Sequence, residues 1–182
     1  FESAIDPNNP NIVYAESQHG GLVRYDKATG ESVGIQPQPR KGENEYRWNW
    51  DVPLMTSAHK PGRIYFAANK VFRSDDYGNT WQVISEDITR NMDRNKLPFM
   101  GKVWSVDAVG KNSGVALYGT VSALYESPKN ENVIIVGTDD GLIQITSDGG
   151  KSWKKTDGVA GVPSMTYVYH VLASQHDDVH AG

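Results

Sequence analysis

The 182-residue sequence predicts an all-β fold, namely a segment of a β-propeller, and three observations support this prediction. The periodic runs are short, rich in Val, Ile, Tyr and Phe, and bounded by Gly, Pro, Asn and Asp, as β-strands are. The pattern contains no convincing long amphipathic helix. One series of turns and strands also recurs along the chain, and a long repeat built only of strands is typical of four-stranded propeller blades.

Each repeat opens with a polar turn that precedes an apolar run. The equivalent turn residues are Asp6, Ser57, Ser127 and Ser174. The runs that follow the first three turns predict strands at Asn11–Ala15, Arg63–Ala67 and Asn132–Gly137. After a second turn, further strands are expected at Leu22–Tyr25, Val71–Arg73 and Leu142–Ile145. The interval between the second and third polar turns is the longest, so the second repeat carries an insertion between Glu86 and Tyr118.

These intervals divide the chain into units at about 1–46, 47–118 and 119–166 and a partial unit at 167–182, with the insertion at 86–118. Phe1–Ala4 is typical of the end of an innermost strand, and the last residues stop within the second strand of a fourth unit. A closed propeller usually has about four to eight blades. We therefore expect an incomplete segment of roughly 3.5 blades, with the remaining blades of a longer parent chain as its partner.

The third strand of each unit leads into an eight-residue stretch, called the octet here. SDDYGNTW at 74–81 and TSDGGKSW at 146–153 share the form Ser/Thr-x-Asp-x-Gly-x-Ser/Thr-Trp, and the first unit carries a degenerate copy at 26–33. In such a turn Asp accepts backbone hydrogen bonds, Gly permits a positive φ, and Trp packs between sheets. We expect a structural turn and not a calcium loop, whose spacing differs. The residues in this role are Ser74, Asp76, Gly78, Thr80, Trp81, Thr146, Asp148, Gly150, Ser152 and Trp153.

The octets resemble the Asp-boxes of BNR-type propellers, which include sialidases, xyloglucan hydrolases and sortilin-like receptors. The stretches YRWNWDVPLMTSAHKPGRIYFAANKVFRSDDYGNTW and ESPKNENVIIVGTDDGLIQITSDGGKSW are similar to large bacterial propeller proteins described as sortilin-like or glycosyl-hydrolase-like. The resemblance implies a propeller fold, an extracellular or periplasmic location, and ligand sites on the face opposite the Asp-boxes. It does not distinguish an enzyme from a binding protein, because Asp-boxes occur in both.

If each octet joins the third and fourth strands, the opposite face receives the second-to-third turns and the connections between blades, at 34–48, 86–118 and 157–167. The Trp residues of EYRWNWD at 45–51 could stack on sugar rings or peptide side chains, or pack between blades. The apolar insertion is expected to fold over this face, either as a functional lid or to cover a groove between blades or contact another domain. The candidate ligand-binding residues are Arg47, Trp48, Trp50, Asp51, His19, Asn69, Asp107, Asp139 and Asp140.

Composition argues against several classes of function. The net charge is −4 and the basic residues are scattered, which disfavours nucleic acid as a partner. No apolar run approaches the roughly 20 residues of a membrane span. Without cysteine there is no disulfide, Cys-ligated zinc or thiol nucleophile. His170, His176 and His180 do not share a helical face, so we expect no metal site and no cofactor.

The preferred function is a non-catalytic scaffold that binds a glycan, peptide or protein partner on the face opposite the octets. The alternative is a fragment of a secreted glycoside hydrolase of the sialidase or xyloglucanase type. That chemistry needs two carboxyl groups about 5 to 9.5 Å apart. Asp139 and Asp140 are adjacent and would point apart in an extended segment. The Arg motif of sialidases is also absent, so the catalytic residues stay unknown.

Overall fold

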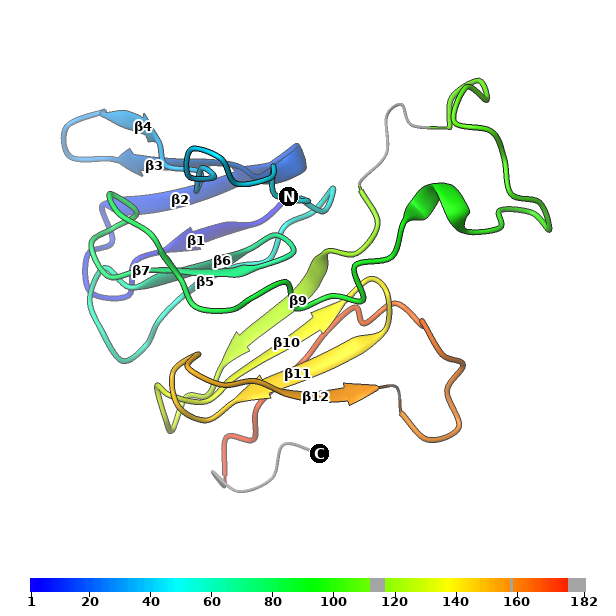
Figure 1. Ribbon diagram of the computed structural model, residues 1–182. Helices are drawn as coiled ribbons and strands as arrows, with labels where there is room; N and C mark the ends of the chain where they lie inside the picture. The colour runs from blue at the N-terminus through cyan, green and yellow to red at the C-terminus, as the bar shows by residue number, and fades with distance from the viewer. Residues whose placement is uncertain (112–116, 158, 177–182) are drawn as a thin grey trace.

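The computed structural model describes residues 1–111, 117–157 and 159–176, which form three four-stranded antiparallel sheets (Figure 1). Strands that are consecutive in the sequence are neighbours in each sheet, so every sheet is an up-and-down meander. The predicted all-β class is confirmed. Within the described residues, helical structure is confined to two 3-10 turns, η1 (Gln18–Gly20) and η2 (Arg94–Lys96).

The strands have the following bounds. The first sheet contains β1 (Ser3–Ile5), β2 (Ile12–Ser17), β3 (Gly21–Asp26) and β4 (Ser32–Gly34). The second contains β5 (Leu54–Thr56), β6 (Ile64–Ala67), β7 (Val71–Ser74) and β8 (Gln82–Val83). The third contains β9 (Val121–Glu126), β10 (Ile134–Thr138), β11 (Leu142–Thr146) and β12 (Lys154–Asp157).

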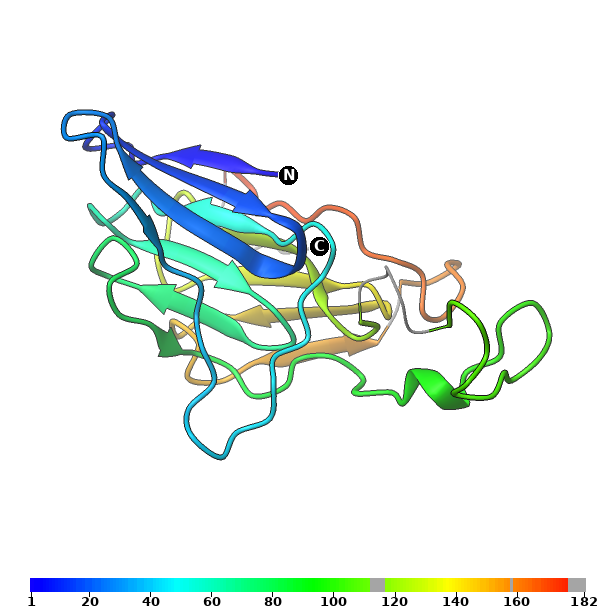
Figure 2. The same cartoon turned by 90° about the horizontal axis from the view of Figure 1, so that it is seen from above.

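The sheets meet at their first strands, as the blades of a propeller do. β1 contacts β5, and β5 contacts β9, whereas β4, β8 and β12 lie at the opposite edges of their sheets (Figures 1 and 2). All four residues of β12 are exposed, and two of them are lysines, which oppose pairing at an open edge. The fold is therefore propeller-like.

The described residues form three clusters of buried apolar side chains, the smallest of which contains Tyr46, Ala68 and Phe72. The first core contains Ile12, Tyr14, Leu22, Ile35, Val52, Leu54, Ile64 and Phe66. The second contains Tyr65, Ala67, Val71, Ile88, Val121, Ile134 and Val136. Alternate side chains of β6 point to opposite faces, so Ile64 and Phe66 enter one core while Tyr65 and Ala67 enter the other. The middle sheet is covered on both faces, which explains the continuous apolar run of β6.

One turn recurs four times along the chain. The side chains of Asp6, Ser57, Ser127 and Ser174 each accept a hydrogen bond from the backbone N–H two residues later, at 2.9, 3.1, 3.2 and 3.1 Å. The fourth of these turns lies in the segment 159–176, whose described residues contain no strand. The strand expected after it, at 179–182, lies outside the described residues.

The first octet folds into a hydrogen-bonded turn that joins β7 to β8. Asp76 Oδ1 accepts from the Thr80 N–H at 2.8 Å, and Oδ2 accepts from the Thr80 hydroxyl at 2.6 Å. The Ser74 hydroxyl donates to Asp76 and accepts from the Gly78 N–H, each at 2.8 Å. Gly78 has a φ of +83°, a conformation that glycine adopts at little cost.

The second octet repeats this turn between β11 and β12. Asp148 accepts from the backbone and hydroxyl of Ser152 at 2.9 and 2.5 Å, and the Thr146 hydroxyl accepts from the Gly150 N–H at 2.9 Å. The hydrogen bonds from Ser152, followed by that from Thr146, lower the pKa of the Asp148 carboxyl. The acidic residue of the octet is thus an ionised acceptor that holds its own turn together.

The tryptophan of each octet ties its sheet to the preceding one. Trp81 Nε1 donates to the carbonyl of Ile35 at 2.7 Å, and Trp153 Nε1 donates to the carbonyl of Ile84 at 2.8 Å. Ile35 follows β4 and Ile84 follows β8, so both acceptors lie where the chain leaves the preceding sheet. Each of these two octets therefore stabilises its own turn and the contact between its sheet and the preceding one, which is called the seam here.

Candidate functional site

The octets and the first-to-second turns share one face of the molecule. The Tyr77 N–H donates to the carbonyl of Gly62 at 2.9 Å, and the Gly149 N–H donates to that of Asn132 at 3.0 Å. The turns β2–β3, β6–β7 and β10–β11 and the insertion lie at the other face, on the right in Figure 1. The predicted site residues belong to this second face or to the insertion that extends from it.

Trp48 and Trp50 occupy different environments. Trp48 packs among core rings, with centroids 5.2 Å from Phe66 and 5.8 Å from Phe72, as the packing alternative expects. Trp50 is 41% exposed and meets the His19 ring edge-to-face at 5.2 Å. Of the two tryptophans, Trp50 is therefore the one that a ligand could reach.

Arg47 and Asn69 join the first connection to the insertion. The Arg47 N–H donates to Asn69 Oδ1 at 2.9 Å, and Asn69 Nδ2 donates to Asp87 Oδ2 at 3.1 Å. The Arg47 guanidinium donates to Asp87 at 2.7 Å, to Thr89 at 3.0 Å and to the carbonyl of Gly119 at 3.1 Å. Both side chains thus hold the beginning and the end of the insertion in place.

Asp139 and Asp140 both lie in the β10–β11 turn, and each anchors one root of the insertion. Asp139 Oδ1 accepts from the N–H groups of Gly119 and Thr120 at 3.0 and 2.8 Å, and Oδ2 accepts from the Thr120 hydroxyl at 2.8 Å. Asp140 Oδ2 accepts from the Arg90 N–H at 2.8 Å, and its carbonyl accepts from Arg90 Nε at 2.7 Å. The adjacent carboxylates therefore hold the outgoing and the returning chain on the β10–β11 turn.

Asp139 is one of several side chains whose pKa is raised. Burial raises the pKa of the Asp139 carboxyl to about 6, against the hydrogen bonds from Thr120. Burial also raises the pKa of the Tyr167 phenol, and the carboxylates of Asp139 and Asp51 add to the rise. Glu16 behaves likewise, because burial raises its pKa and Asp51 adds to the effect. A carboxyl group of raised pKa in a hollow is a candidate for binding or proton transfer.

That hollow is a cavity of about 850 Å³, lined by residues of the insertion together with Asp139 of the β10–β11 turn. Its wall is mostly apolar and aromatic, with two cationic side chains and the Asp139 carboxyl. The lining residues are Arg94, Leu97, Pro98, Phe99, Trp104, Ala108, Val109, Gly110, Lys111, Tyr118 and Asp139. An apolar cavity with a few convergent polar groups and a perturbed carboxyl is the usual form of a ligand site.

The insertion projects outward from the face and does not lie flat over it (Figures 1 and 2). It carries its own hairpin-like turn, in which Phe99 forms an antiparallel bridge with Lys102. Between them, Met100 and Gly101 both have a positive φ. Asp107 lies on this arm, is exposed, and accepts a hydrogen bond from the Ser105 hydroxyl at 3.4 Å. Asp107 is absent from the lining of the cavity, and so are Trp48 and Trp50.

Sequence reasoning missed Arg94, Lys111, Tyr118, Tyr167 and Glu16. The first three lie within or just after a segment without strand periodicity, so no pattern indicated which side chains would face inward. Glu16 lies at a buried position of β2, and the alternation of that strand was the available signal. Tyr167 lies in the connection 157–167 and offered no local signal.

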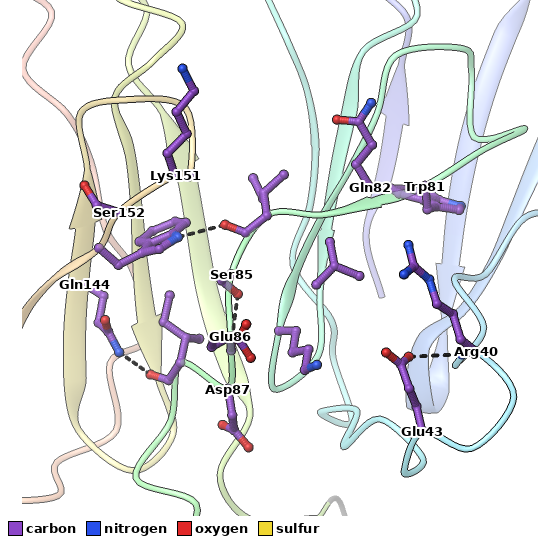
Figure 3. A pocket seen from close by; sticks show the side chains of 16 residues that line it. Arg40, Glu43, Trp81, Gln82, Ser85, Glu86, Asp87, Gln144, Lys151 and Ser152 are labelled. Carbon is purple, nitrogen blue, oxygen red and sulfur yellow. Dashed lines mark hydrogen bonds between the residues drawn. The ribbon is translucent and has the colours of Figure 1, made fainter.

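A second hollow, a groove of about 650 Å³, runs along the outer side of the second and third sheets. Figure 3 shows Trp81 and Gln82 on one side of it, Gln144 and Ser152 on the other, and Glu86 between them. Several lining groups are already used within the protein: Gln144 Nε2 donates to the Ile88 carbonyl at 2.6 Å, and the octet tryptophans form the seams described above. This groove is therefore a seam between sheets rather than the better ligand site.

In residues 1–111, 117–157 and 159–176, no three His, Cys, Asp or Glu side chains gather in a way that could hold a metal ion. His180 of the histidine group lies outside these residues. Over the same ranges, no helix has the length and apolar character needed to cross a bilayer.

The raised pKa of Asp139 predicts how stability depends on pH. The folded state binds the proton of the Asp139 carboxyl more tightly than the unfolded state does. Its contribution to the free energy of unfolding is therefore fully present below the ordinary pKa of 3.8 and is lost as pH rises through about 6. Between pH 7 and pH 4 the free energy of unfolding should gain up to about 3 kcal/mol from this residue. Urea unfolding at several pH values measures the gain.

Asp139→Asn is the control, because it removes the titrating carboxyl group and keeps an oxygen that can accept the hydrogen bonds from Gly119 and Thr120. Glu16, whose pKa is also raised, contributes with the same sign in both proteins and cancels in the difference. The difference between the two stability profiles should therefore decline from pH 4 to pH 7. Parallel profiles over that range would contradict the assignment.

Comparisons with known proteins identify relatives at the level of fold. No protein-family model matches the chain. An oligoxyloglucan-reducing end-specific xyloglucanase from Emericella nidulans is 22% identical over 153 residues, which are 84% of this chain and 17% of the relative. The chain therefore spans about a sixth of the length of this curated relative.

Solved structures agree with the sheet arrangement. A GH74 enzyme of Niastella koreensis superimposes with a TM-score of 0.57 and 18% identity, covering 92% of this chain and 23% of that one. The GH74 xyloglucanase from Xanthomonas campestris gives a TM-score of 0.53 and 19% identity, covering 88% of this chain and 20% of that one. The extracellular domain of a one-component system from B. thetaiotaomicron gives a TM-score of 0.55 and 13% identity, covering 96% of this chain and 19% of that one. At these identities the likeness concerns the fold.

Proposed function

We propose that this chain is the carbohydrate-binding part of a larger propeller protein, and that its ligand occupies the cavity beneath the insertion. One observation carries the proposal: aromatic side chains and a carboxyl group of raised pKa line the same cavity, on the face opposite the octets. Phe99, Trp104 and Tyr118 supply the flat apolar surfaces on which sugar rings stack. Arg94 and Lys111 supply polar groups that orient hydroxyls.

The relatives support a carbohydrate in preference to a peptide or protein ligand, since two of them are named as xyloglucanases. Within this proposal the octets are Asp-boxes, and the units at about 1–46, 47–118 and 119–166 are blades of a propeller that the parent chain completes. The location is extracellular or periplasmic, consistent with the extracellular domain among the structural neighbours.

The test is calorimetric titration of the full-length protein with a xyloglucan heptasaccharide and with cellotetraose. Trp104→Ala should weaken binding by about tenfold, because an aromatic stacking surface contributes about 1 to 1.5 kcal/mol. Trp50→Ala is the matched control, since Trp50 is exposed to the same extent but does not line the cavity. If Trp50→Ala abolished binding and Trp104→Ala did not, the ligand would lie at the EYRWNWD segment instead.

A second candidate function, glycoside hydrolysis, is favoured by the raised pKa of Asp139, which suits a general acid near neutral pH. The release of reducing ends from xyloglucan by the full-length protein measures it. Asp139→Asn should abolish turnover while leaving heptasaccharide binding within about threefold. Turnover that survives Asp139→Asn would remove Asp139 from the role of acid.

A further inference from the structure

The cavity beneath the insertion carries two cationic side chains that form no ion pair with any carboxylate in the part of the chain that the structure describes. Arg94 and Lys111 both line it and are half-buried. Among the described residues, no carboxylate lies within ion-pair distance of either side chain. The Arg94 guanidinium donates to the carbonyl of Lys111 at 2.9 Å, and the Lys111 ammonium donates to the carbonyl of Trp104. Both acceptors are backbone carbonyl groups, so these contacts orient the two side chains without neutralising their charge.

The carboxyl group of the cavity does not cancel this charge. Both oxygens of Asp139 accept hydrogen bonds from Gly119 and Thr120, at 2.8 to 3.0 Å, so the group is turned toward the backbone that it anchors. The lining of the cavity therefore combines two cationic side chains with one carboxyl group whose oxygens are already hydrogen-bonded. At low local dielectric such a site attracts an anion more strongly than the bulk surface does.

The aromatic wall restricts the shape of that anion. The Trp104 indole is fixed by a hydrogen bond from its Nε1 to the Phe99 carbonyl at 3.0 Å, and the Lys102 ammonium lies 4.7 Å from its ring centroid. A fixed ring beside two cations suits a ligand that has a flat apolar face and an anionic group at its rim. A sugar ring with a carboxylate substituent has both.

We propose that the cavity selects a carboxylated sugar, such as a uronic acid residue of a glycan, with its carboxylate at Arg94 and Lys111 and its ring against Trp104. The proposal rests on the proposed function and narrows it to acidic glycans. Arg94 contributes a planar fork that can bind both carboxylate oxygens, and Lys111 contributes a point charge.

The experiment titrates the full-length protein with trigalacturonate and with the neutral cellotriose at low ionic strength. Trigalacturonate should bind about tenfold more tightly, and the preference should shrink in about 0.5 M NaCl as charge is screened. Arg94→Gln and Lys111→Gln should each remove most of the preference, measured as the ratio of the trigalacturonate and cellotriose affinities of the same variant. Arg94→Lys should retain part of it, because the charge remains.

Lys96→Gln is the matched control, since Lys96 belongs to the same 3-10 turn as Arg94 but does not line the cavity. Its preference for trigalacturonate should equal that of the unmodified protein, and thermal unfolding should show each variant to be folded. Equal affinity for both trisaccharides, unaffected by Arg94→Gln, would overturn the acidic-glycan inference and leave the proposed function standing. Binding of neither trisaccharide nor the heptasaccharide would overturn both.

Discussion

Replacing Gly150 by alanine should destabilise the protein by about 3 kcal/mol. Gly150 has a φ of +94°, which strains any residue with a Cβ atom. A Cβ at this position would also lie 2.7 Å from the carbonyl oxygen of Ile84, and that carbonyl accepts the Trp153 hydrogen bond. The octet and the seam between the second and third sheets would therefore be disturbed together. Urea unfolding measures the loss of stability.

Gly30→Ala is the matched control, because Gly30 holds the same position in the degenerate octet. Its φ is +77°, but no atom lies within 4 Å of the Cβ that alanine would add. The free energy of unfolding of this variant should therefore fall only by the cost of backbone strain, about 1 kcal/mol. Equal losses at Gly30 and Gly150 would show that backbone conformation alone, and not the seam, determines the need for glycine.

Replacing Asp139 by alanine should cost about 3 kcal/mol, because the N–H groups of Gly119 and Thr120 lose their buried acceptor. Thr120 is completely buried, so water cannot replace the carboxylate. The amide hydrogens of Gly119 and Thr120 should exchange much faster with solvent, and hydrogen exchange followed by mass spectrometry would detect this at the root of the insertion.

Asp139→Asn separates the anchoring role from the charge. The amide oxygen can still accept from Gly119 and Thr120, so the loss of stability should stay within about 1 kcal/mol. Protection of the two amides should persist in this variant. Comparable exchange in Asp139→Ala and the unmodified protein would mean that other contacts, such as the hydrogen bond from Arg47 to the Gly119 carbonyl, suffice to hold the root.

The regular part of the fold could be predicted because its signals are local. Strand alternation and bounding turns predicted β2, β6 and β10, and the form of the octets indicated a positive φ at Gly78 and Gly150. The acceptors of the octet tryptophans could not be foreseen. Trp81 donates to Ile35, which is 46 residues away in a connection without periodicity.

The candidate site was predicted only in part, because it depends on contacts between distant segments. The expectation that Asp139 and Asp140 point apart assumed an extended segment, whereas both lie in the β10–β11 turn. Their partners are Gly119, just after the insertion, and Arg90, within it. The insertion was expected to fold over the face, and it projects from it. Its path is set by these anchors and by its own hairpin-like turn, neither of which leaves a periodic pattern in the sequence.

The hydrogen bonds from the octet tryptophans also imply an order of events during synthesis. Trp153 reaches back 69 residues to the carbonyl of Ile84, so the acceptor is made long before its donor. At about 5 to 20 residues per second, a ribosome needs roughly 3 to 14 s to supply it. Throughout that interval the side of the nascent second sheet that will contact the third sheet stays uncovered. Chaperones that act on the growing chain should therefore engage each sheet until its successor has emerged.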